Sequence, residues 1–123
     1  MPSATKSRRW GANRWRRRGE SAATAAEGDE QPIDAAALVE ALVEAFQATG
    51  RGAYASQAVR AFEWFLGRNR LGIAVYDFTS GGCHDGLGPE SLNENEGAES
   101  TLSFLQALLA LNGAGLQSSL PTP

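Results

Sequence analysis

The stretch DAAALVEALVEAFQAT, residues 34–49, carries the clearest structural signal in the chain. Its apolar residues recur every three or four positions, which places them on one face of an α-helix and leaves the glutamates on the other. The apolar positions are Ala35, Leu38, Val39, Leu42, Val43 and Phe46. Pro32 suits the start of a helix, and Gly50 and Gly52 favour its end. These features predict an amphipathic helix over residues 34–49.

A second helix is predicted over residues 54–68, where the same spacing continues. Its apolar positions are Ala55, Ala58, Val59, Phe62, Phe65 and Leu66. Arg60 and Glu63 are expected on the solvent side. Because residues 49–53 form a short connection, we expect the two helices to be antiparallel neighbours.

A third helix is predicted over residues 96–111. We expect an apolar side made by Ala98, Thr101, Leu102, Leu105, Leu108 and Leu109, and a polar stripe made by Glu99, Ser103 and Gln106. Asn93 followed by Glu96 predicts a capping box, with Asn95 as the alternative cap. The three stretches together predict an all-α fold.

A long Gly-rich loop separates the second and third predicted helices, residues 69–95. Loops of this length in compact domains are usually functional or bound to a partner. Apolar and polar residues alternate within it, which favours a short strand or hairpin around residues 73–77 and 82–86.

Charge divides the chain into a basic start and an acidic remainder. Residues 1–20 hold seven Lys and Arg residues against one acid, whereas residues 21–123 hold four basic and thirteen acidic residues. We expect a disordered basic tail at 1–32, a helical domain at 33–113 and a disordered C-terminus at 114–123. The tail interleaves Arg with Trp, a pattern that suits nucleic acid or acidic membranes, but we expect a solvated tail or residues from a shifted start site.

Composition excludes several classes of protein. One cysteine cannot build an internal disulfide framework. No apolar run approaches the roughly 20 residues that span a bilayer, so we expect no membrane span. The acids that follow the arginines exclude an export signal, so we expect a cytoplasmic protein. Nothing that resembles a nucleic-acid-binding fold follows the tail, so no nucleic-acid partner is expected. We also expect no cofactor.

Metal-ligating and nucleophilic residue types meet at Cys83, His84 and Asp85. Three consecutive side chains rarely point at one ion, and no second His or Cys completes a zinc site, so no metal is expected. A Cys83 nucleophile would need a base, but neighbours in an extended segment point to opposite sides.

Carboxylates and one aromatic ring are the candidates for carbohydrate chemistry. Asp85 with Glu96 or Glu99 supplies the two carboxyl groups that glycoside chemistry uses. The alternative is that Glu96 and Glu99 are ordinary first-turn acids that complement a helix dipole. Trp64 could stack on a sugar, although a Trp at helical spacing more often packs in the core.

Four motifs resemble a known bacterial pattern: QPID at 31–34, AFEWFLGRN at 61–69, TSGGCHDGL at 79–87 and NENEGAESTLSFL at 93–105. In this order they are similar to the C-terminal end of the helical (α/α) toroid-like region that is attached to some bacterial glycosyltransferases. The resemblance covers residues 31–111. The nucleotide-sugar-using catalytic part of such proteins has no counterpart in this sequence.

The resemblance implies a partial (α/α) toroid in which the loops before the inner helices rim a carbohydrate pocket. The polar residues that it places on this rim are His84, Asp85, Asn95, Glu96 and Glu99. With Trp64, these are the candidate saccharide contacts, and Asp85, Glu96 and Glu99 are the catalytic candidates.

Three functions follow as expectations. The first is a fragment or remnant of a glycosyltransferase-associated helical domain, structural or sugar-binding rather than catalytic. The second is a small interaction module that docks on a separately encoded glycosyltransferase or toroid partner. The third is a minimal acid/base carbohydrate enzyme. Because the helices carry more apolar surface than their neighbours can cover, we also expect self-association.

Overall fold

A computed structural model describes residues 30–118 of the chain and shows an all-α fold. Its elements are α2 (Pro32–Thr49), α3 (Gly52–Phe62), the short 3₁₀ helix η2 (Glu63–Leu66) and α4 (Ala98–Gly113). No strand occurs in this part of the chain. None of the helices in the described residues is long and apolar enough to cross a membrane.

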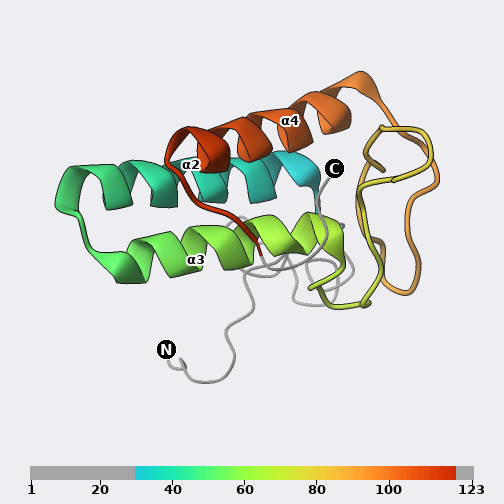
Figure 1. Cartoon of the computed structure of the whole chain (residues 1–123). Helices are drawn as coiled ribbons and strands as arrows, with labels where there is room; N and C mark the ends of the chain where they lie inside the picture. Colours follow the sequence, from blue (N-terminus) through green and yellow to red (C-terminus); the bar gives the residue numbers. More distant parts are fainter. Residues whose placement is uncertain (1–29, 119–123) are drawn as a thin grey trace, which may run out of the picture.

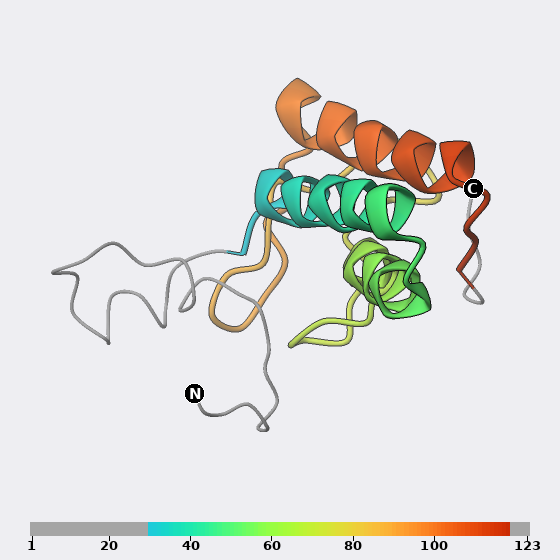
Figure 2. The ribbon, with the colours of Figure 1, turned by 90° about the vertical axis from the view of Figure 1, so that its left-hand side faces the viewer.

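The three α-helices pack side by side, with α2 between α3 and α4 (Figures 1 and 2). α3 runs antiparallel to α2, as the short connection predicts, and α4 runs parallel to α2 (Figure 1). The N-termini of α2 and α4 therefore lie at the same end of the bundle as the C-terminus of α3. The segment between α3 and α4 folds over that end.

The first predicted helix is confirmed, with small changes at its ends. α2 begins two residues earlier than predicted because Pro32 occupies its first turn, and the carbonyl of Gln31 accepts the N–H of Asp34 at 3.1 Å. It ends at Gly50, whose φ of 72° lets its N–H donate to the carbonyl of Phe46. Gly52 does not end α2; it is the first residue of α3.

The second predicted helix, 54–68, is shorter than expected. α3 ends at Phe62, and the chain tightens into η2 before Gly67, at φ 115°, ends the run. This tightening changes the position of Glu63, which is 3% exposed rather than on the solvent side. Its carboxylate lies 3.2 Å from Arg68 Nε and accepts a hydrogen bond from Ser118 Oγ at 2.6 Å.

The third predicted helix presents a different face to the core. Leu102, Leu105 and Leu109 are exposed, whereas the buried residues of α4 are Ser100, Ser103, Phe104, Ala107 and Leu111. The serines and Ala107 are small, so this face can approach α2 closely. The prediction of which side of this helix faces the core is therefore wrong, although Leu108 packs against the core as expected.

Aromatic rings form the centre of the core. Phe104 stacks on Tyr76 with ring centroids 4.3 Å apart, and it also contacts Phe62 at 5.6 Å and Phe65 at 5.3 Å. Tyr76 belongs to the segment between α3 and α4. This contact fixes the segment to the helices.

The predicted hairpin at 73–77 and 82–86 is present only as one antiparallel bridge, Tyr76 with Cys83. The N–H of Asp77 donates to the carbonyl of Gly82 at 2.8 Å, and the N–H of His84 donates to that of Val75 at 2.9 Å. A further bridge pairs Glu30 with Leu87.

The expected tail, 1–32, lies outside the described residues except for residues 30–32. Glu30 is buried and Pro32 belongs to α2, so these residues are part of the fold. Residues 119–123 of the expected C-terminal tail also lie outside the described part. Before them, Leu116 packs against the core and its N–H donates to the carbonyl of Leu111 at 2.9 Å.

Candidate functional site

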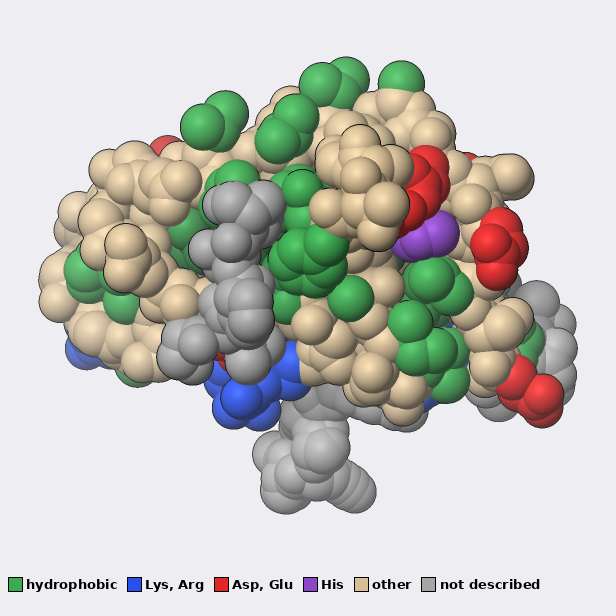
Figure 3. Space-filling view, turned by 45° about the vertical axis from the view of Figure 1, so that its right-hand side comes forward, with side chains coloured by type: hydrophobic (Ala, Val, Ile, Leu, Met, Phe, Trp, Pro, Cys, Tyr) green, Lys and Arg blue, Asp and Glu red, His purple; other side chains and the backbone are tan. Residues whose placement is uncertain are grey.

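The polar residues singled out in the sequence gather at the end of the bundle where α2 and α4 begin (Figure 1). On the surface of this end, the histidine lies beside acidic side chains (Figure 3). The structure divides the candidates among three places: a side-chain cluster around His84, a hollow beside Glu99 and a cleft beside Trp64.

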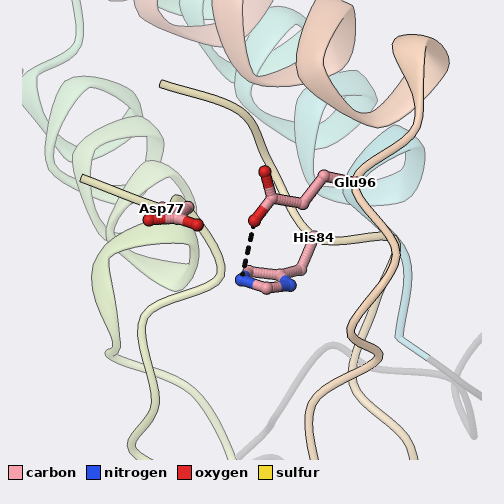
Figure 4. A group of neighbouring side chains, drawn as sticks. All are labelled: Asp77, His84 and Glu96. Carbon is pink, nitrogen blue, oxygen red and sulfur yellow. Dashed lines mark ion pairs between the residues drawn. The ribbon is translucent and has the colours of Figure 1, made fainter. Parts of the chain in front are cut away.

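The cluster is formed by Asp77, His84 and Glu96 (Figure 4). One ligand atom of each, a carboxylate oxygen or an imidazole nitrogen, lies within 4.8 Å of the others. His84 Nε2 is 3.3 Å from Glu96 Oε2, and the His84 side chain is only 13% exposed. Among the described residues, this is where a metal ion could be held by protein side chains.

Backbone pairing explains why Asp77 and His84 meet. Asp77 lies opposite Gly82 in the paired segments, and His84 follows Gly82 by two residues in the second segment. In an antiparallel pair such diagonal neighbours share a face. The sequence pattern predicted the two paired segments, so the Asp77–His84 proximity could have been found from it; Asp77 was not among the predicted site residues.

Gly82 and Ser80 position Glu96. A Cβ atom on Gly82 would lie 2.7 Å from Glu96 Oε1, so the carboxylate occupies space that only a glycine leaves open. Ser80 Oγ donates to the same Oε1 at 2.7 Å. The other carboxylate oxygen, Oε2, is thereby turned toward His84.

The orientation of the His84 ring is set from its other side. Nδ1 lies 2.9 Å from the carbonyl oxygen of Asn93. Since a carbonyl only accepts, Nδ1 carries the proton, and Nε2 is the atom directed at the carboxylates.

The neighbours of Asp77 lower the pKa of its carboxyl group. A hydrogen bond with Glu96, followed by the N–H groups of Thr79 and Ser80, lowers the pKa of Asp77 to about 2. The Thr79 N–H donates to Asp77 Oδ1 at 2.8 Å. The charged carboxylate is therefore held in place by its own turn.

Asp85 holds the start of α4. Its Oδ1 accepts the Ser100 hydroxyl at 2.7 Å and the Gly97 N–H at 2.9 Å, and these two bonds lower the pKa of Asp85. The predicted capping box is wrong: α4 has Gly97 at its N-cap and no side-chain cap from within its own sequence. Asp85 supplies the missing acceptor from the preceding loop.

Glu99 lies in a hollow of about 320 Å³ between the first turns of α2 and α4. Asp85, Gln31 and the half-exposed Ile33 also line it. Glu96 is not one of its lining residues, so of the three catalytic candidates only Asp85 and Glu99 share a hollow.

Asn95 is exposed beside this end of the bundle. Its N–H donates to Asn93 Oδ1 at 2.9 Å, and its carbonyl accepts the N–H of Asp85 at 2.8 Å. Its backbone therefore helps to hold the loop that carries the acidic residues.

Trp64 lies away from the other candidates and is 2% exposed. Its indole Nε1 donates to Glu30 Oε1 at 3.1 Å, and Glu30 Oε2 is 3.2 Å from Arg70 Nε. The ring borders an open cleft of about 920 Å³, which is also lined by residues of α2 and α3, among them Arg60, and by Arg68 after η2. Its faces pack mainly against the protein, as the packing alternative for Trp64 predicts.

Cys83 is buried and lies on the core side of the bridge. Burial, followed by the negative charges of Asp85 and Glu96, raises its pKa to about 12. A thiol that stays protonated at neutral pH is a poor nucleophile, so this position suits packing.

Comparison of the chain with models of protein families, with curated proteins and with solved structures gives no match.

Proposed function

We propose that the chain is a helical unit of the (α/α) type, akin to the toroid-like regions attached to bacterial glycosyltransferases, that binds saccharide or supports a saccharide-binding rim and does not catalyse by itself. The observation that carries this proposal is the hollow at the first turns of α2 and α4, which brings Asp85 and Glu99 together beside an exposed apolar side chain, Ile33. The resemblance of residues 31–111 supplies the carbohydrate class.

The chemistry of the hollow suits a sugar. Carboxylates accept hydrogen bonds from hydroxyl groups, and an apolar side chain can cover the C–H face of a pyranose ring. A volume of about 320 Å³ lies at the small end of the range of about 300–1,000 Å³ for ligand pockets, which favours one or two sugar units.

Binding is favoured over catalysis because Asp85 is already engaged. A glycosidase pairs a carboxyl group that donates a proton with a second, ionised carboxylate that faces the substrate. The Ser100 and Gly97 hydrogen bonds lower the pKa of Asp85, which excludes it as the proton donor, and they occupy its Oδ1 in holding the start of α4. Glu96 is engaged with His84 and Ser80, outside the hollow.

The test is saccharide binding by the full chain, measured by saturation-transfer NMR with mannose, glucose, galactose and maltose. We expect transfer to at least one of them and an affinity about tenfold lower in Glu99→Gln, because a hydrogen bond to a charged group is lost. Glu90→Gln is the matched control, since Glu90 is an exposed acid outside the hollow. Absence of binding to all four sugars would contradict the proposal.

The same samples test the enzymatic alternative. A minimal carbohydrate enzyme would turn over maltose, and the turnover would disappear in Glu96→Gln or Glu99→Gln. Binding without turnover agrees with the proposed role.

A second candidate function is docking on a partner, and the outer face of α4 favours it. Leu102, Leu105 and Leu109 are 58%, 41% and 67% exposed. Leu109 also borders an open groove of about 660 Å³ between α2 and α4. In an (α/α) toroid, neighbouring helices would cover such a face. Both the proposed helical unit and the docking module therefore predict an exposed apolar surface on α4.

A further inference from the structure

We infer that Asp77, His84 and Glu96 form a binding site for a divalent transition-metal ion of the zinc type. One imidazole nitrogen and two carboxylate oxygens make up the donor set, and the three side chains converge from both sides of a turn and from the loop before α4 (Figure 4). This inference does not depend on saccharide binding.

The spacing of the donor atoms is close to what one ion requires. Zinc binds nitrogen and oxygen at about 2.0–2.2 Å, so two ligands of a tetrahedral ion lie about 3.4 Å apart. His84 Nε2 and Glu96 Oε2 are already 3.3 Å apart. One donor atom of each of the three side chains lies within 4.8 Å of the others.

The proton on His84 is in the place that metal binding needs. A metal-ligating histidine usually donates its other ring N–H to a carbonyl or carboxylate, which leaves the ligating nitrogen with a free lone pair. His84 Nδ1 meets the carbonyl of Asn93 at 2.9 Å, outside the cluster, and Nε2 faces the two acids. The ring is thus held in the orientation of a metal ligand, with Nε2 toward the two acids.

Both carboxylates are also held by groups behind them. Ser80 Oγ donates to Glu96 Oε1 at 2.7 Å, while Thr79 N–H donates to Asp77 Oδ1 at 2.8 Å. The second oxygen of Glu96, Oε2, is left to face His84 Nε2. Such outer hydrogen bonds orient ligands and are typical of metal sites.

Charge favours a cation at this point. Two carboxyl groups that lie this close either share a proton, as the hydrogen bond with Glu96 that lowers the pKa of Asp77 implies, or bind a cation between them. Among residues 30–118, the ion pairs of Arg68 and Arg70 are made with Glu63 and Glu30, and neither arginine pairs with Asp77 or Glu96. A metal ion that is shared with the His84 imidazole would supply a positive charge at this point.

The donor set selects the class of metal. Imidazole suits zinc and its neighbours in the first transition row, whereas calcium and magnesium prefer oxygen alone. Three protein ligands leave a fourth position of a tetrahedral zinc ion for solvent.

The experiment titrates the metal-free full chain with zinc chloride and follows heat by calorimetry and the imidazole signals by NMR. The chain contains one histidine, so these signals report this site alone. We expect one zinc ion per chain and a shift of the His84 resonances. Calcium chloride should bind more weakly, because it gains little from the imidazole.

Asp77→Asn and Glu96→Gln keep size and shape, and each should weaken zinc binding at least tenfold. Gly82→Ala removes no donor atom, yet its Cβ displaces the Glu96 carboxylate and should weaken binding as well. Glu90→Gln is the matched control and should bind zinc as the unaltered chain does. Thermal unfolding without metal verifies that each variant is folded.

The inference is overturned if millimolar zinc leaves the His84 resonances unmoved. It is equally overturned if zinc binds Asp77→Asn and Glu96→Gln as tightly as the unaltered chain. In either case the cluster is a set of hydrogen-bonded side chains that does not bind a metal ion.

Discussion

Gly82 lies opposite Asp77 across a chain reversal, and its missing side chain leaves the space that the Glu96 carboxylate occupies. The alternation of residues 73–77 and 82–86 predicted that these segments pair, and this much of the site follows from the sequence. The approach of Glu96 does not, because it depends on where the loop before α4 passes over the turn. Residue spacing carries no information on that path.

The contacts of Asp85 also could not be predicted from the sequence. The sequence predicted a rim position for it, but its main contacts are the Gly97 N–H and the Ser100 hydroxyl. A local capping box was expected instead because sequence rules look for caps only within a few residues of a helix. Here the acceptor comes from twelve residues before the N-cap.

Asp85 should make the stability of the fold depend on pH in acid. Because its pKa is lower in the folded chain than in the unfolded chain, its contribution is present above about pH 4 and is lost as pH falls through the folded pKa. We expect Asp85→Asn to be less stable at pH 6 and to approach the unaltered chain near pH 2. Urea unfolding at both values measures this; a pH-independent difference would contradict it.

Glu30 should stabilise the fold through two side-chain partners. It is 7% exposed and accepts hydrogen bonds from Trp64 and Arg70. Glu30→Ala removes both bonds in a buried place and should lower the free energy of unfolding by about 1–3 kcal/mol. Glu40→Ala, an exposed acid on α2, should change it by less than about 0.5 kcal/mol. Equal stability of the two variants would refute this role of Glu30.

At the scale of elements, α2 was predicted almost completely and α4 was predicted with the wrong face inward. α2 has one apolar stripe, and it packs on both neighbours along that stripe. α4 is apolar on more than one side, so counting leucines selected Leu102, Leu105 and Leu109. In the structure, Phe104 and the small residues around it are buried instead. Close helix packing and aromatic contacts stabilise this face more than the leucines would.

Two substitutions on α4 distinguish these faces. Phe104→Ala removes a ring that contacts Phe62, Phe65 and Tyr76, and it should cost about 3–5 kcal/mol of unfolding free energy. Leu109→Ala, at a position 67% exposed, should cost less than about 0.5 kcal/mol in the monomer. Chemical denaturation at low protein concentration compares the two. If Leu109→Ala lowers the free energy of unfolding more than Phe104→Ala does, the buried face of α4 is the one predicted from the sequence.

At the scale of the whole molecule, the all-α class and the three helices follow from apolar spacing alone. The parallel arrangement of α2 and α4 does not, because a long connection permits either direction. The carbohydrate class remains a proposal, which rests on the order of four sequence motifs. What the helices leave uncovered is the outer face of α4.

That face should make the isolated chain self-associate. We expect sedimentation velocity to show a growing average mass as the concentration rises. The double variant Leu102→Glu and Leu109→Glu should remain monomeric, because charge replaces the most exposed apolar surface. Gln106→Glu, a single added charge at an exposed polar position of α4, is the control. If the chain is a monomer at every concentration and unfolds cooperatively, the claim that it is part of a larger helical unit is contradicted.

Saccharide binding at the hollow between α2 and α4 tests the proposed function most directly. Saturation-transfer NMR on the full chain, on Glu99→Gln and on Glu90→Gln gives the comparison. The proposed function predicts transfer to at least one sugar for the unaltered chain and Glu90→Gln, with an affinity about tenfold lower for Glu99→Gln. No transfer to any sugar, or equal affinity in Glu99→Gln, would contradict it.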